Sequence, residues 1–259
     1  MSKFIDKLNR TSQAVPQPMG FRPGQSVSSR PKILLVASLA RANVSNLADL
    51  VAGADAGLVH ISRLGADIKA LQGYSQAVPD IPWGGWLRGI GGRETSLKGT
   101  TCDFVVFPAN TPLGILQNTK VGKILEVEPS LSEGLLKTVD ELPVDGVLIA
   151  SKQEEGYRLT WQQLMLFQHF ADSVAKPLLV PAPSKVMASE LQVLWEAGVD
   201  GVIVEVGAGQ PLEGLGKLRQ AIDKLTFPSQ RRRGKAKALL PRVSVETDVD
   251  TEEELPGDL

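Results

Sequence analysis

Two short apolar sequence motifs, or phrases, alternate along the chain and predict an α/β protein with a (β/α)8 TIM barrel fold. One phrase begins with aspartate, as in residues 200–205 (DGVIVE), and the other begins with lysine or proline, as in residues 177–180 (PLLV). Each phrase occurs four times, and successive copies begin roughly 20 to 30 residues apart, which leaves room for a crossover helix between them. Alternating strands and helices give a parallel sheet, and eight such units close into a barrel.

The eight expected strands are short, apolar and rich in β-branched residues, as strands covered on both faces are. In chain order they span residues 32–36, 55–60, 82–86, 103–108, 123–127, 145–150, 177–180 and 200–205. An open, doubly wound sheet is the alternative, and a Gly-x-Gly after the first strand would favour it. Residues 38–41 (SLAR) stand at that place, so the barrel is the expected fold.

Helix-start signals follow two of the strands. Asn110 or Thr111 can cap a helix that begins at Pro112. Thr160 and Gln163 have the spacing of a capping box, in which each side chain satisfies a backbone N–H of the other residue. These signals place helices where the barrel needs its crossovers.

The barrel is expected to span residues 31–227, between an N-terminal arm over residues 1–30 and a charged tail over residues 228–259. The arm begins with three apolar residues at the spacing of a helical turn: Phe4, Ile5 and Leu8. We expect this turn to plug the N-terminal mouth of the barrel. The tail has few apolar residues and many charges of both signs, so it is expected to be disordered. It either solubilises the protein or docks on a protein partner.

Composition excludes several classes of protein. The 259 residues are 42% apolar with a formal charge of −1, as in one ordinary domain without the basic field that recruits nucleic acid. No apolar run has the length of a membrane span, and the N-terminus lacks a signal-peptide core. Cys102 is the single cysteine, which indicates a reducing compartment, so the expected location is the cytoplasm.

The third expected strand holds paired glycines, Gly84 and Gly85, between Trp83 and Trp86. Glycine inside a strand marks a close backbone approach or space left for another group. That group is either a ligand or the two tryptophan rings. In the first case both rings are expected to wall the ligand pocket.

Candidate catalytic residues are the polar side chains near the C-terminal ends of the strands, where barrel enzymes place their chemistry. Aligning the Lys/Pro strands by their first residues puts Glu126 at the position of Leu35, Gly85 and Val180. A charge at a position that is otherwise apolar needs a functional or an electrostatic reason. The resulting candidates are His60, Glu126, Glu128 and Glu205.

Two alternative roles for these carboxylates stay open. They could form salt bridges with Arg41, Arg88 or Lys152 at the rim of the barrel. Alternatively, the three glutamates could hold a divalent cation, since hard oxygen ligands suit magnesium, although no Asp or Asn accompanies them. Lys152 is itself a candidate amine nucleophile for a Schiff base, but it lies beyond the apolar run, beside acidic residues.

A phosphate-binding loop is expected after the eighth strand, where residues 207–210 are Gly207, Ala208, Gly209 and Gln210. These glycines allow backbone N–H groups to approach an anion, and Ser184 after the seventh strand could add a donor as a helix cap. Together with residues 197–201 (AGVDG), this stretch resembles the phosphate-binding (β/α)8 superfamily, including its flavin-linked and sugar-phosphate members. The chain departs from that pattern after the seventh strand, where residues 181–184 (PAPS) contain no glycine.

The resemblance implies a small-molecule ligand, either a phosphorylated metabolite or FMN, bound at the ends of the seventh and eighth strands. An enzyme of this kind would be a lyase or isomerase, or a flavin-linked oxidoreductase, with a glutamate as acid or base. The alternative function is a non-catalytic barrel that acts as a binding or scaffold module through its two tails.

Overall fold

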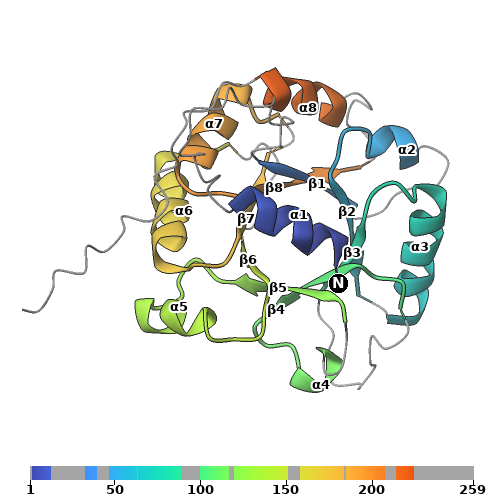
Figure 1. The fold of residues 1–259 in the computed structure, drawn as a ribbon, viewed down its shortest axis with the longest axis horizontal. Helices are drawn as coiled ribbons and strands as arrows, with labels where there is room; N and C mark the ends of the chain where they lie inside the picture. The colour runs from blue at the N-terminus through green and yellow to red at the C-terminus, as the bar shows by residue number, and fades with distance from the viewer. Residues whose placement is uncertain are drawn as a thin grey trace, which may run out of the picture.

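Eight parallel strands close into a barrel in the order β1 to β8, and β8 pairs back to β1 (Figure 1). The computed structural model describes residues 2–12, 33–39, 47–62, 64–88, 100–116, 120–150, 158–183, 185–207 and 214–224. The strands are β1 (Leu34–Leu39), β2 (Ala56–Ile61), β3 (Trp83–Leu87), β4 (Phe104–Pro108), β5 (Gly122–Val127), β6 (Gly146–Ile149), β7 (Leu178–Ala182) and β8 (Gly201–Val206). All eight expected strands are confirmed, each with its bounds shifted by at most a few residues.

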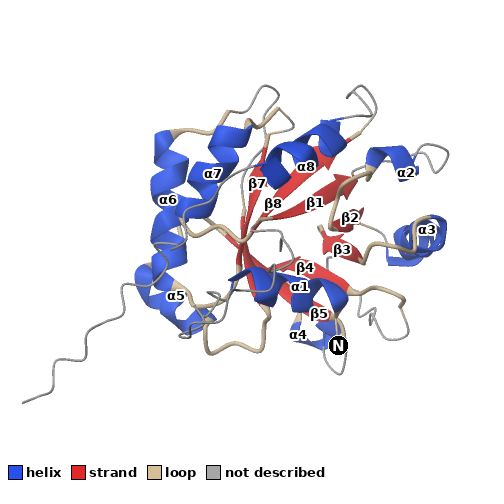
Figure 2. Cartoon of the chain, turned by 45° about the horizontal axis from the view of Figure 1, so that its top comes forward, coloured by secondary structure: helices blue, strands red, loops and turns tan. Residues whose placement is uncertain are grey.

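Helices surround the barrel, while one helix lies across its centre (Figures 1 and 2). They are α1 (Lys3–Ser12), α2 (Leu47–Leu50), α3 (Leu64–Ala77), α4 (Leu113–Leu116), α5 (Glu133–Val139), α6 (Trp161–Ser173), α7 (Ala188–Glu196) and α8 (Gly214–Lys224). The capping box is confirmed: Thr160 Oγ1 accepts the Gln163 N–H, and Gln163 Oε1 accepts the Thr160 N–H. None of the helices in the described ranges is long and apolar enough to cross a bilayer.

The strands separate two apolar clusters. One cluster fills the space between the sheet and the outer helices, and the other fills the inside of the barrel. Along each strand every second residue points inward, so the inner cluster defines the inward positions. The strand residues of the inner cluster are Leu34, Val36, Ala56, Leu58, Trp86, Phe104, Val106, Ile124, Leu148, Leu179 and Ile203.

Helix α1 closes the N-terminal mouth of this barrel, as expected of the arm. Phe4, Ile5 and Leu8 are buried in the inner cluster, and the rings of Phe4 and Phe104 lie 4.3 Å apart. The carboxylate of Asp103, just before β4, accepts three hydrogen bonds at 2.8 to 2.9 Å. The donors are the Ser2 hydroxyl and the backbone N–H groups of Lys3 and Phe4. One carboxylate therefore satisfies donors at the helix N-terminus that have no partner within the helix.

The aspartates that begin the even-numbered strands explain the repeated phrase. Asp200 donates its N–H to the Leu178 carbonyl at 2.8 Å, and its carboxylate accepts the Leu178 N–H at 2.8 Å. Asp55 makes the same pair of contacts with Leu35 of β1. Each aspartate thus fixes its own strand against the preceding one.

The same two contacts join Asp145 to Lys123 of β5. Asp103 keeps the backbone half of the motif, because its N–H donates to the Trp83 carbonyl at 2.9 Å. Its carboxylate is used for α1 instead. Asp103 therefore holds α1 in the N-terminal mouth of the barrel.

The paired glycines make room for core side chains, not for a ligand. A Cβ at Gly84 would overlap the ring of Phe104, and one at Gly85 would overlap the Ile61 side chain. A Cβ at Gly57 on β2 would likewise overlap the Trp83 ring. The strand is glycine-rich because large side chains on its neighbours occupy the space.

We expect Asp103→Asn to lower the free energy of unfolding by about 1 to 2 kcal/mol, because the amide loses the charge and one of the acceptor oxygens that cap α1. Urea unfolding measures the change. Asp172→Asn, an exposed position of α6, is the matched control and should have little effect. Equal effects of the two changes would show that the α1 contacts do not contribute to stability.

We expect Gly84→Ala to destabilise the barrel by about 1 to 3 kcal/mol, because the added methyl group must displace the Phe104 ring in a close-packed interior. Gly73→Ala in α3 is the control, since a Cβ there meets nothing within 4 Å. That change should stabilise the helix slightly. A neutral Gly84→Ala would mean that the interior has space to spare.

Candidate functional site

The C-terminal mouth of the barrel is lined by two sets of structurally equivalent residues. The aspartate contacts make Leu35, Trp83, Lys123 and Leu178 equivalent in the odd-numbered strands. Counting three residues onward from each gives the first set: Ser38, Trp86, Glu126 and Pro181. Counting five residues onward from each aspartate gives the second set: His60, Pro108, Ala150 and Glu205. Interior layers drawn from alternate strands are typical of this barrel.

This equivalence corrects the alignment of Glu126. When the odd-numbered strands are aligned by their first residues, Glu126 is placed at the position of Leu35, Gly85 and Val180. The backbone contacts of the aspartates show that this alignment is wrong. A lysine at the start of a strand does not mark the register, because Lys123 is itself the residue that the aspartate contacts. The residues at positions equivalent to Glu126 on the inner wall are therefore Ser38, Trp86 and Pro181.

Ser38 and His60 form a hydrogen-bonded pair on adjacent strands. The Ser38 hydroxyl oxygen lies 3.1 Å from His60 Nε2. Ser38 is only 2% exposed, so its hydroxyl needs this partner. His60 is half-buried, and the contact fixes the orientation of its ring.

Burial lowers the pKa of His60 from 6.5 to about 4, with a smaller contribution from the positive charge of Arg88. The imidazole is therefore neutral at pH 7. A neutral ring can accept a proton through one nitrogen and donate one through the other. Nε2 faces Ser38, and no described residue makes a hydrogen bond to Nδ1.

Trp86 joins three of the polar residues. Its Nε1–H donates to Glu126 Oε2 at 2.8 Å across the barrel interior. Its ring meets the edge of His60 at a centroid distance of 5.1 Å and an interplanar angle of 80°. The Arg88 guanidinium carbon lies 4.0 Å from the centroid of a Trp86 ring. These contacts, with the one between Ser38 and His60, connect five residues into one group. We call this group the mouth cluster: Ser38, His60, Trp86, Arg88 and Glu126.

Glu128 and Glu205 lie at the same mouth but are not held by it. Both are exposed, and Glu128 is contacted weakly by the Ser130 hydroxyl at 3.5 Å. Glu205 pairs in register with Ser38, on the neighbouring strand. Among the described residues no group of three metal-ligating side chains could hold an ion, so the three glutamates do not make a cation site.

Trp83 does not share the interior with Trp86. It packs among the outer cluster beside Tyr74, at a ring distance of 5.8 Å, and its indole N–H donates to the Val78 carbonyl at 2.8 Å. Consecutive residues of a strand face opposite sides, and three positions separate these two tryptophans. Of the two tryptophans expected to face the interior, only Trp86 does so.

Several expected residues fall outside the described ranges: Lys152, Ser184, Ala208, Gly209 and Gln210. Helix α7 begins at Ala188 with Met187 as its N-cap residue, so Ser184 is not the cap of that helix. Gly207 is described and half-buried, and no described residue lies within 4 Å of a Cβ built on it. Within the described part of the chain, the end of β8 thus has open space beside its backbone.

Ser38 was missed as a candidate because it reads as the end of an apolar strand. Its signal is its position: it is equivalent to Trp86 and Glu126 once the strands are aligned by their aspartate contacts. Arg88 was expected only as a salt-bridge partner of the glutamates. The described residues place it on Trp86 instead.

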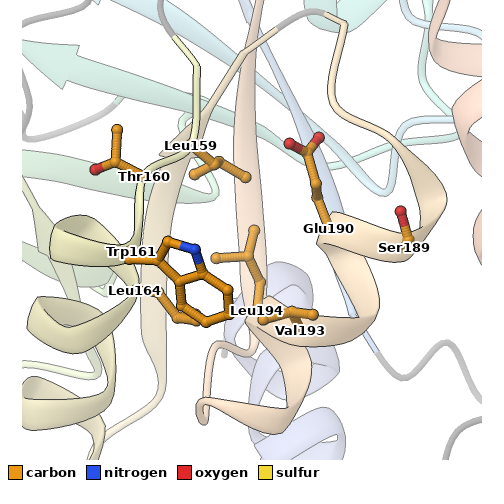
Figure 3. Close-up of a pocket in the computed structure, with 8 residues that line it drawn as sticks. All are labelled: Leu159, Thr160, Trp161, Leu164, Ser189, Glu190, Val193 and Leu194. Atoms are coloured by element: carbon orange, nitrogen blue, oxygen red, sulfur yellow. The ribbon is translucent and has the colours of Figure 1, made fainter.

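A hollow lies outside the barrel, between α6 and α7 (Figure 3). It has a volume of about 270 Å³, and Trp161, Leu164, Val193 and Leu194 line it. Trp161 is 80% exposed. The polar groups at its edge, Thr160 and Glu190, are used to cap α6 and α7. The groove therefore lacks the convergent polar groups of a catalytic site.

The sequence matches no protein-family profile and no curated protein sequence. Its structure is similar to several solved barrels. Thiamine phosphate pyrophosphorylase from Pyrococcus furiosus has a TM-score of 0.54 and 15% identity, covering 74% of this chain and 96% of that one. Orotidine 5'-phosphate decarboxylase from Pyrococcus horikoshii has a TM-score of 0.54 and 13% identity, covering 73% and 100%.

The tryptophan synthase α-subunit from Pyrococcus furiosus has a TM-score of 0.57 and 12% identity, covering 74% of this chain and 97% of that one. At these identities the similarity shows the fold alone. The chain therefore shares the barrel fold of these enzymes, to which it is distantly similar.

We expect the free energy of unfolding to fall as the pH decreases from 6.5 to about 4. In this window unfolded His60 binds a proton that the folded protein excludes, so protonation favours the unfolded state. Above pH 6.5 His60 is neutral in both the folded and the unfolded state, so its titration no longer lowers the free energy of unfolding. His60→Gln should flatten this part of the pH profile, whereas His169→Gln, at an exposed position of α6, should leave its slope unchanged. An NMR titration that gave His60 a pKa near 6.5 would contradict the burial argument.

Proposed function

We propose that this protein is an enzyme that binds a phosphorylated small molecule at the C-terminal mouth and catalyses proton transfer, as a lyase or isomerase does. The observation that carries the proposal is the mouth cluster itself. Ser38, His60, Trp86 and Glu126 place polar contacts inside a barrel wall that is otherwise apolar. Polar groups in such a place cost free energy unless their partners are present. The opposite mouth, by contrast, is filled by α1.

Glu126 is the proposed general base. The Trp86 indole holds Oε2, which leaves Oε1 for a proton on the ligand. His60 is the proposed second proton-transfer group, because its ring is neutral at pH 7 and Nδ1 faces away from Ser38. Glu128, Glu205 and Lys152 remain candidates for ligand contact at the outer edge of the mouth.

The phosphate group is proposed to bind at the end of β8, with Gly207, Ala208, Gly209 and Gln210, and with Ser184 near the end of β7. The open space beside Gly207 supports this placement. Two of the similar barrels are named for phosphate esters, thiamine phosphate and orotidine 5'-phosphate. Backbone N–H groups in a glycine-containing loop are suitable donors for such a group.

FMN is the less favoured ligand. A flavin ring system needs a broad apolar wall, and Trp83, one of the two rings expected to supply it, packs outside the barrel. A non-catalytic barrel that serves as a binding or scaffold module is the alternative function. It would bind neither class of ligand at this mouth.

The proposal is tested by thermal-shift screening of the full chain against phosphorylated metabolites of three to six carbons, with FMN as a separate arm. A ligand at a hundred times its Kd should stabilise the protein by about 2.7 kcal/mol. Stabilisation by FMN together with a yellow protein would favour the flavin-linked oxidoreductase. Stabilisation by no compound would favour the scaffold function.

For a turned-over metabolite found in this way, we expect Glu126→Gln to lower kcat by roughly 10² to 10⁴. The amide keeps an acceptor oxygen for the Trp86 N–H, so the fold should be retained. Glu141→Gln, at an exposed position outside the mouth, is the matched control. Unchanged turnover in Glu126→Gln would remove Glu126 from the mechanism.

A further inference from the structure

Arg88 is a cation at the C-terminal mouth whose guanidinium rests on an aromatic ring. It follows β3 and is exposed, and its guanidinium lies over Trp86 at 4.0 Å from a ring centroid. In the described part of the chain, no carboxylate lies within ion-pair distance of it. Three glutamates belong to the same mouth, yet the side chain rests on the indole. Cation–π contact of this kind is favourable but does not use the N–H donors.

The surface beneath Arg88 is fixed in place. Trp86 is 7% exposed, its N–H is held by Glu126, and its ring is packed against the edge of His60. The guanidinium therefore has one face covered by a rigid platform. Its N–H groups lie in the plane of the group, where they form a fork that matches two oxygens of a carboxylate or phosphate. An arginine with a fixed position loses less entropy when it binds such a group.

The charges nearby favour a singly charged group. Glu126 is joined to Arg88 through Trp86, and His60 adds no positive charge at pH 7 because its pKa is about 4. A phosphate dianion on Arg88 would be repelled by the Glu126 carboxylate about twice as strongly as a singly charged group would. We infer that Arg88, seated on Trp86, is a recognition site for a carboxylate of the ligand.

The position of this site extends the proposed function. β3 and β7 are four strands apart in a ring of eight, so Arg88 lies across the mouth from the end of β7. If the phosphate binds at the β7 and β8 ends, which rests on the proposed function, the ligand spans the mouth. The substrate class is then a phosphorylated carboxylic acid, with its central carbons near Glu126 and His60.

The carboxylate site is tested without any phosphorylated compound. Sodium acetate is titrated into the ¹⁵N-labelled full chain at pH 7, with sodium chloride at equal ionic strength as the reference. The indole N–H signal of Trp86, assigned through Trp→Phe variants, reports occupancy. We expect a saturable shift with acetate and a weaker response to inorganic phosphate at this signal.

Arg88→Gln should weaken the acetate response at least roughly tenfold, since a hydrogen bond to a charged group is lost. Arg88→Lys keeps the charge but not the fork, and should also weaken it. Arg10→Gln is the matched control, because Arg10 is an exposed residue of α1 at the other mouth. An absent acetate response, a response unchanged in Arg88→Gln, or a stronger response to phosphate would each overturn the carboxylate assignment.

A second comparison separates this inference from the proposed function. The wild-type chain should bind 3-phosphoglycerate more tightly than glycerol 3-phosphate, and Arg88→Gln should remove that preference while leaving the weaker binding of glycerol 3-phosphate. If acetate binds at Arg88 but neither phosphorylated compound binds more tightly than acetate, the carboxylate site stands and the phosphate site fails. If both phosphorylated compounds bind equally in the wild-type chain, the phosphate site stands and the substrate class is wrong.

Discussion

The contact on which the barrel depends is the one between an aspartate and the backbone of the preceding strand. Asp55, Asp145 and Asp200 each use an N–H and a carboxylate to contact a single residue of that strand. Asp200 is fully buried, where an unpaired carboxylate would cost several kcal/mol. A shift of one residue would break both contacts and turn every side chain to the other face. The repeat therefore fixes the register of three strand pairs, and with it which residues face inward.

This register also makes the two mouths of the barrel different. At the N-terminal mouth, the carboxylate of Asp103 is released from the strand contact and caps α1, whose apolar residues fill the interior. At the C-terminal mouth, the inward positions carry Ser38, His60 and Glu126, which no apolar core requires. Because α1 fills the N-terminal mouth, the inward polar residues face solvent only at the C-terminal mouth.

The strands could be predicted from the sequence because the phrases are local, and their spacing fixes the parallel order. The inner wall could be predicted only in part. His60 and Glu205 were placed at equivalent positions correctly, because their strands begin with the residue that makes the register contact. Glu126 was misaligned because a leading lysine has no such role, and Ser38 was missed because it ends an apolar strand. Trp83 and Trp86 occupy opposite faces because three positions separate them along one strand.

The electrostatics of the mouth support the proposed proton transfer. The carboxylates of Glu126 and Glu128 lie at the end of β5 and that of Glu205 on β8, and they form no metal-ligand set among the described residues. Glu126 has one oxygen fixed by an indole N–H and the other unassigned, while His60 is kept neutral beside it by burial and by Arg88. In the proposed mechanism, Glu126 and His60 on this shared aromatic platform accept a proton from one atom of the ligand and return it to another. Because Trp86 contacts both groups and Arg88, its fixed ring sets the positions of all three side chains relative to one another.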